Sequence, residues 1–154
     1  MERGRESHHA GVRGAVAGAV AAACWAAAEP GLGRVFGTPY SDVRLLGRGL
    51  TRGRRWRTAG TVLHLANGAA FGWAFARLGG RGIRHGMLAA QAENAALWPL
   101  MLVVDRAHPD RRAGTWPRLA TSPRVAGYAI AAHALFGAVL GALAGRSGRH
   151  GTGS

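Results

Sequence analysis

Three ionisable side chains occur in stretches that are otherwise almost free of charge: His64, Glu93 and His133. Two imidazoles and a carboxylate are a sufficient set of ligands for a divalent metal ion such as zinc or iron. The same groups could instead relay protons or line the path of a substrate, since ionisable residues in apolar segments often mark such pathways. Two histidines could also be the axial ligands of a haem. The residue types therefore leave several kinds of chemistry open.

Further polar residues lie in or beside the same stretches. The whole candidate cluster is Glu29, His64, Asn67, Gln91, Glu93, Asn94 and His133. A central charge in hydrocarbon costs roughly 3 kcal/mol on insertion scales, so these side chains are expected to face the interior of a bundle. In the simplest, structural interpretation, Glu93 is protonated or hydrogen-bonded to His133 or Asn67, and the cluster fixes helix register. The metal interpretation uses His64, Glu93 and His133, although no Glu-x-x-His pair of the kind found in di-iron bundles lies within a predicted membrane helix.

Sequence motifs of other enzyme classes are also missing. No serine lies in a Gly-x-Ser-x-Gly elbow, and Cys24 has no histidine beside it. The segment GRGLTRGRRW lacks the Gly-Lys-Ser/Thr ending of a phosphate-binding loop. We therefore predict no particular catalytic residue and leave open whether the protein is an enzyme. We expect no resident cofactor unless a divalent metal ion binds the cluster.

Four apolar segments must position these side chains. They cover about residues 11–29, 58–76, 86–104 and 125–145. Each is close to the roughly 20 residues that a helix needs to cross the hydrocarbon layer of a membrane. A water-soluble bundle would instead show a charged stripe on each helix, but Tyr128 and His133 are the only strongly polar residues of the last segment. The pattern predicts an all-α protein, a four-helix transmembrane bundle.

Composition and charge also favour a membrane over nucleic acid. All 20 basic residues are Arg, and the net charge is +13. A basic chain can neutralise phosphates, but almost all of these arginines lie outside the apolar segments rather than along one helix face. Charge separated along the chain in this way is what a bilayer requires. Lipid is therefore the expected partner, and nucleic acid is not.

The remaining segments flank or connect the spans. Residues 1–10 are predicted to be a basic N-terminal tail and 146–154 a disordered C-terminal tail, so the membrane domain covers 11–145. Pro30 is expected to end or kink the first helix. The connection that follows predicts a short helix with Ser41 as its N-cap. The connection before the last span is expected to be irregular because it contains three prolines, Pro109, Pro117 and Pro123.

One short pattern occurs twice. The stretch HLANGAAFG, His64 to Gly72, returns as HALFGAVLG, His133 to Gly141. This predicts a duplicated helical hairpin, with spans one and two equivalent to spans three and four. Both repeats would have the same orientation in the membrane, because each contains an even number of spans. Chance similarity within a biased composition is the alternative.

Glycines at four-residue spacing accompany this repeat. Residues at i and i+4 share one face of a helix, and in lipid such glycines allow two backbones to approach closely. We expect these stripes to face inward, and the two that carry a histidine could face each other. The glycines predicted to pack the helices are Gly14, Gly18, Gly68, Gly72, Gly137 and Gly141.

Four stretches, EPGLGRVFGTPYSDVRLLGR, HLANGAAFG, ENAALWPLMLVVDRAHPD and HALFGAVLG, resemble segments of small, uncharacterised integral membrane proteins of GC-rich actinobacteria. The resemblance covers most of Ala10 to Leu143. It implies a multi-pass protein of the bacterial plasma membrane, with four helices and no established activity. We therefore expect a structural or accessory membrane protein that could form a homo-oligomer. The alternatives are a small transporter or proton-coupled channel, and a metal-dependent membrane enzyme that uses Glu93, His64 and His133.

Overall fold

The computed structural model describes residues 2–146, with the side chains of 9–145, and this part of the chain contains helices and no strand. The all-α class is therefore confirmed for the described residues. The tail predicted to be disordered lies outside them from residue 147 on. The helices are α1 (Glu2–Phe36), α2 (Asp42–Leu50), α3 (Trp56–Arg77), α4 (Gly82–Leu97), the 3-10 turn η1 (Trp98–Leu100), α5 (Met101–Ala107), α6 (Pro109–Arg112) and α7 (Pro123–Arg146).

Three helical stretches are long and apolar enough to cross a membrane. They are His9–Phe36 in α1, Gly82–Ala107 across α4, η1 and α5, and Pro123–Gly145 in α7. The helix α3 has 22 residues, which is enough to span, but it is less apolar and is not one of the three. The described residues are thus consistent with a membrane protein that has three candidate spans, where the sequence predicts four.

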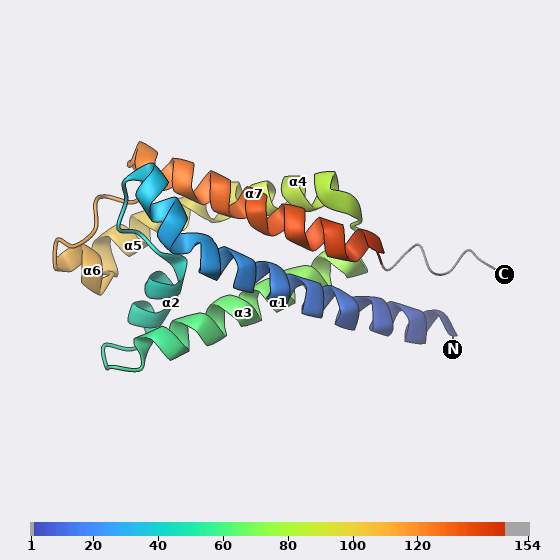
Figure 1. The fold of residues 1–154 in the computed structure, drawn as a ribbon. Helices are drawn as coiled ribbons and strands as arrows, with labels where there is room; N and C mark the ends of the chain where they lie inside the picture. The colour runs from blue at the N-terminus through green and yellow to red at the C-terminus, as the bar shows by residue number, and fades with distance from the viewer. Residues whose placement is uncertain (1, 147–154) are drawn as a thin grey trace.

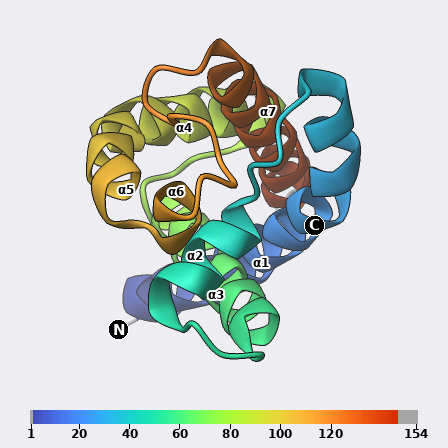
Figure 2. The ribbon, with the colours of Figure 1, turned by 90° about the vertical axis from the view of Figure 1, so that its left-hand side faces the viewer.

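The four long helices form an arc rather than a closed bundle (Figure 1). The helix α1 packs against both α3 and α7, and α4 packs against α7. The helices α3 and α4, which are both fully described, make at most marginal contact with each other. Figure 2 views the arc from one end, where the short helices α2 and α6 lie in front of it. The helix α1 begins and α7 ends at the opposite end of the molecule.

Glycines bring α1 against α3. A Cβ atom added to Gly18 would collide with the carbonyl oxygen of Gly68, and one added to Gly72 would collide with that of Gly14. A methyl group cannot share space with a backbone carbonyl, so only glycine permits this approach. The first seam, as we call the contact of these four glycines, joins the two helices of the first hairpin.

A second seam joins α4 to α7. A Cβ atom on Gly86 would collide with the carbonyl oxygen of Gly137, and one on Gly141 with that of Gly82. The sequence had allowed the glycine stripe that follows His64 to face the one that follows His133. The structure does not bring these two stripes together. Each meets glycines of the other long helix in its own hairpin, although the connection within each hairpin is long and the short connection is the one between α3 and α4. Gly82 and Gly86 are not among the glycines predicted to pack the helices, although they repeat the four-residue spacing.

Two prolines modify the predicted spans differently. The sequence predicts that Pro30 ends or kinks the first helix. It does not end the helix, because α1 continues to Phe36. Proline removes one backbone donor, and a helix can tolerate this loss where other groups or local adjustments satisfy the backbone. At Pro99 the helix does change: α4 ends, and the turn η1 connects it to α5. The third predicted span is therefore an interrupted helix.

The short helix α2 forms where the sequence predicts it. Ser41 is its N-cap, and the Ser41 hydroxyl oxygen accepts a hydrogen bond from the Arg44 backbone N–H at 3.1 Å. A Cβ atom on Gly60 of α3 would collide with the carbonyl oxygen of Val43 in α2. The helix α2 is thus packed closely against α3 and reaches the interior of the arc.

Candidate functional site

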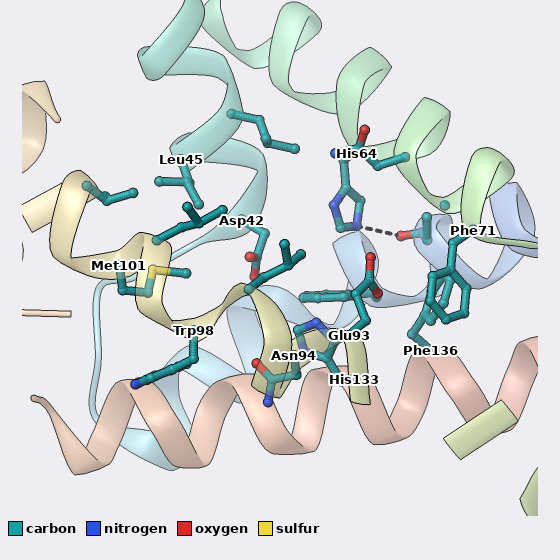
Figure 3. Close-up of a pocket in the computed structure, with 18 residues that line it drawn as sticks. Asp42, Leu45, His64, Phe71, Glu93, Asn94, Trp98, Met101, His133 and Phe136 are labelled. Carbon is teal, nitrogen blue, oxygen red and sulfur yellow. Dashed lines mark hydrogen bonds between the residues drawn. The ribbon is translucent and has the colours of Figure 1, made fainter. Parts of the chain in front are cut away.

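A cavity of about 370 Å³ lies within the arc. Residues of α1, α2, α3, α7 and the stretch from α4 to α5 line it (Figure 3). Three lining residues, Asn67, Leu97 and Leu100, are exposed, which places the opening between α3 and α4, where the two helices stay apart. Most of the wall is apolar. Its polar side chains are Asp42, His64, Asn67, Glu93, Asn94 and His133.

Five of the seven residues of the predicted cluster therefore meet at one cavity, and two lie elsewhere. The side-chain amide of Gln91 donates a hydrogen bond to the carbonyl oxygen of Ile130 at 2.8 Å and so joins α4 to α7. Glu29 is buried but does not line the cavity.

Glu29 holds the N-terminus of α2. Its carboxylate accepts hydrogen bonds from the Ser41 hydroxyl at 2.5 Å and from the backbone N–H groups of Asp42 and Val43 at 2.7 and 3.2 Å. A negative charge that accepts from the free N–H groups of a helix start is stabilised there. Glu29 thus positions α2, and with it the side chain of Asp42.

Both histidines of the cavity donate to backbone carbonyls. Nε2 of His64 lies 3.2 Å from the carbonyl oxygen of Ala22 on α1, and Nδ1 of His133 lies 2.7 Å from that of Ala129 on α7. A carbonyl oxygen only accepts, so these ring nitrogens carry the hydrogen. The other nitrogen of each ring, Nδ1 of His64 and Nε2 of His133, is an acceptor when the ring is neutral.

The same two rings pack on one indole. The ring centroid of Trp25 lies 5.0 Å from that of His64 and 4.6 Å from that of His133. Within the described residues, no group of three or more His, Cys, Asp or Glu side chains is close enough together to hold a metal ion. The geometry therefore does not assemble His64, Glu93 and His133 into the metal site that the sequence allowed.

Glu93 is half-buried, and its carboxyl group lies in the cavity wall (Figure 3). With the residues that the structure describes, this group makes no hydrogen bond and no ion pair. The expected bond to His133 or Asn67 is thus not formed. A carboxyl group in an apolar wall without a protein partner is free to bind another molecule.

Asp42 is a lining residue that the sequence analysis missed. Its Oδ1 accepts a hydrogen bond from the Tyr40 hydroxyl at 2.9 Å, whereas Oδ2 is buried and has no partner within the described chain. Burial and then the neighbouring charge of Glu29 raise the pKa of Asp42 to about 7, while the bond from Tyr40 acts in the opposite direction. The sequence does contain one indication of Asp42: it is an acidic residue that directly follows Ser41, the predicted N-cap of a helix.

Asp42→Asn is expected to change how stability depends on pH. Because folding raises the pKa of Asp42, the folded state holds a proton that the unfolded state has lost, and stability falls as pH rises toward that pKa and slightly beyond it. The wild type should lose about 1.4 kcal/mol between about pH 6 and about pH 8 through this group. The variant should lack this loss. Thermal unfolding in detergent at both pH values measures the difference, and equal pH profiles would contradict the prediction.

A second polar cluster closes the end of the arc at which α2 lies. We call α2, α6 and Trp116 the loop cap. Arg44 of α2 donates to both carboxylate oxygens of the buried Asp110, from Nε at 3.0 Å and from Nη2 at 2.5 Å. Burial alone would raise the pKa of Asp110, but Arg44 and Arg48 outweigh it and hold the pKa below its usual range. The loop cap thus joins the connection between α1 and α3 to the connection between α5 and α7, beside the cavity.

An aromatic stack completes the loop cap. The rings of His108 and Trp116 lie parallel, with centroids 4.7 Å apart. Nε2 of His108 donates to the carbonyl oxygen of Leu45, a residue of the cavity wall, at 3.2 Å. The cap therefore supports one wall of the cavity directly.

Fold and site together define an all-helical protein with three helices able to cross a membrane and with a cavity between them. Comparison of the chain with protein-family models, with curated proteins and with solved structures gives no match. Its function is therefore inferred from the cavity and from the residues that line it.

Proposed function

We propose that the protein is a four-span plasma-membrane protein that binds a small amphiphilic molecule in the cavity between its helices. One observation carries this function: the carboxyl group of Glu93 has no partner among the described residues and lines a cavity that opens between α3 and α4. A purely structural cluster needs its polar groups paired, because an unpaired buried group costs stability. A bound molecule accounts for both the space and the missing partner.

The fourth span in this proposal is α3. Its glycines Gly68 and Gly72 contact Gly18 and Gly14 of α1, and its His64 bonds to Ala22 of the same helix. These contacts run along the apolar part of α1, so a membrane that surrounds α1 also surrounds α3. Close contact with a more apolar helix supports the insertion of α3, although its own composition is less apolar.

The duplication belongs to the same proposal. In the first hairpin Gly18 meets Gly68 and Gly14 meets Gly72. In the second hairpin the equivalent pairs are Gly86 with Gly137 and Gly82 with Gly141. Two hairpins that pack through the same paired spacing support descent from one repeated unit.

We place the protein in the plasma membrane of a GC-rich actinobacterium. The exclusive use of arginine among 20 basic residues, with 25 glycines in 154 residues, supports a GC-rich genome. The segregation of these arginines away from the apolar helices supports a membrane location.

A ligand-binding cavity supports the transporter alternative over a structural or accessory role. The polar groups reach the cavity from α2, α3, α4 and α7, so a bound molecule would contact both hairpins. A metal-dependent enzyme has less support, because the carboxylate and imidazoles do not gather at one point.

Photolabelling with an uncharged amphiphile tests the binding function. The probe is a medium-chain alcohol with a diazirine on its chain, applied to the protein in lipid nanodiscs, and labelled residues are located by mass spectrometry. We expect labels on residues of the cavity wall that lie away from the lipid, such as Trp25, Val104 and Phe136. Asn94→Trp places an indole in the cavity and should lower this labelling about tenfold, the loss for about 1.4 kcal/mol of binding.

Ala96→Trp is the matched control, since Ala96 lies on the same helix α4 but is exposed. This variant should be labelled at the cavity wall like the wild type. Labels confined to lipid-facing residues, or equal cavity labelling in Asn94→Trp and Ala96→Trp, would overturn the proposed function.

A further inference from the structure

The polar wall of the cavity consists mainly of hydrogen-bond acceptors. The carboxyl oxygens of Glu93 and Oδ2 of Asp42 have no partner among the described residues. His64 and His133 each use their N–H on a backbone carbonyl, so their remaining ring nitrogens accept in the neutral form. A ligand that fits such a wall supplies hydrogen-bond donors.

The charges of the lining residues have one sign. Asp42 and Glu93 are acidic, and none of the residues that line the cavity is an arginine, although the chain has 20. The nearest arginines of α2, Arg44 and Arg48, are paired with Asp110 in the loop cap. An anionic head group would therefore meet carboxyl groups without a compensating cation, and in a poorly solvated cavity this repulsion is strong.

The apolar part of the wall suits a cation as well. The rings of Trp25, Phe71, Trp98 and Phe136 line the cavity. In Figure 3, Phe71 and Phe136 lie next to each other, and Trp98 lies near Met101. Aromatic faces attract ammonium groups, and the attraction grows when both partners are desolvated. The two amides, Asn67 and Asn94, can accept through their oxygens.

We infer that the ligand of this cavity is an organic cation, a protonated amine on an apolar body, whose N–H groups bind Glu93 and Asp42. This inference rests on the proposed binding function and names the chemical class of its ligand. The ammonium group supplies donors to these unpaired acceptors and compensates the acidic groups. Among the described residues of the wall, Nε1 of Trp25 is a buried donor without a partner, and it remains available to a polar atom of the ligand that accepts. The apolar body contacts the aromatic rings and enters from the membrane between α3 and α4.

Three photoreactive probes with the same diazirine chain test the inference: a primary amine, an alcohol and a carboxylic acid. The protein is held in nanodiscs of zwitterionic lipid, and each probe concentration is normalised to its uptake by empty nanodiscs. The amine should label the cavity wall at about tenfold lower concentration than the alcohol, and the acid should label it least. Glu93→Gln, which keeps the shape of the side chain, should abolish the preference for the amine over the alcohol, whereas Ala96→Trp on the exposed side of α4 should keep it.

Alcohol labelling also reports whether a variant still forms the cavity. Asp42→Asn provides a second variant, and it should reduce the ratio of amine labelling to alcohol labelling. Equal labelling by amine and alcohol in the wild type, or a preference for the acid, would overturn the cation inference and leave the proposed function standing. Failure of all three probes to label the cavity wall would overturn the proposed function itself.

Discussion

Gly18→Ala is expected to destabilise the protein by about 3 kcal/mol, although it adds only one methyl group. The added Cβ would collide with the carbonyl oxygen of Gly68 and crowd the Cα of Gly72. Backbone atoms cannot move aside as a flexible side chain can, so the helices α1 and α3 must separate along the whole seam. Unfolding of the protein in mixed micelles with increasing dodecyl sulfate measures the change in free energy.

Gly31→Ala is the matched control on the same helix. A Cβ atom at Gly31 meets nothing within 4 Å, and alanine is the better helix former by roughly 0.5 to 1 kcal/mol. This variant should therefore be as stable as the wild type or slightly more stable. If Gly18→Ala and Gly31→Ala unfold alike, the first seam does not hold the two helices together.

Asp110→Asn is expected to cost about 2 to 3 kcal/mol, somewhat less than a fully buried ion pair because both of its arginines are partly exposed. The substitution leaves Arg44 and Arg48 side by side without the carboxylate that they share. Since folding lowers the pKa of Asp110, the stabilisation is present above about pH 4 and disappears as pH falls below that value. Thermal unfolding of wild type and variant at neutral and acidic pH measures both effects.

A double-mutant cycle separates the interaction energy of Arg44 with Asp110 from the general effect of changing the net charge. Arg44→Gln should be costly in the wild type but nearly neutral in the Asp110→Asn background, because its partner is already lost. Arg118→Gln removes one charge from an exposed residue that makes no interaction with the described residues, and it should not change stability measurably. Strictly additive costs of Arg44→Gln and Asp110→Asn would contradict the bidentate pair.

Features that depend on local sequence were predictable. Long stretches without charge predict helices that could cross a membrane, and three such helices are present among the described residues. Ser41 predicts the start of α2, because a hydroxyl can satisfy the free N–H groups of the first turn, and that bond is formed. The four-residue spacing of Gly14 and Gly18 identifies the packing face of α1, because residues at i and i+4 lie on one side of a helix.

Features that depend on which helices meet were not predictable. The cavity exists because α3 and α4 remain apart, and the sequence carries no signal of that separation. Asp42 reaches the cavity because Glu29, distant in sequence, bonds to the start of α2. The partners of His64 and His133 are backbone carbonyls, which have no side-chain signature in a sequence.

The two glycine seams also have a consequence for biogenesis. The first seam joins the first two long helices of the chain, α1 and α3. The first hairpin can therefore complete its tightest packing before the second hairpin has been synthesised. The contact of α1 with α7 is the main contact between the hairpins, and it can form only after the last helix has left the ribosome. The cavity, whose wall contains residues of both hairpins, is therefore completed only after the last long helix has been synthesised.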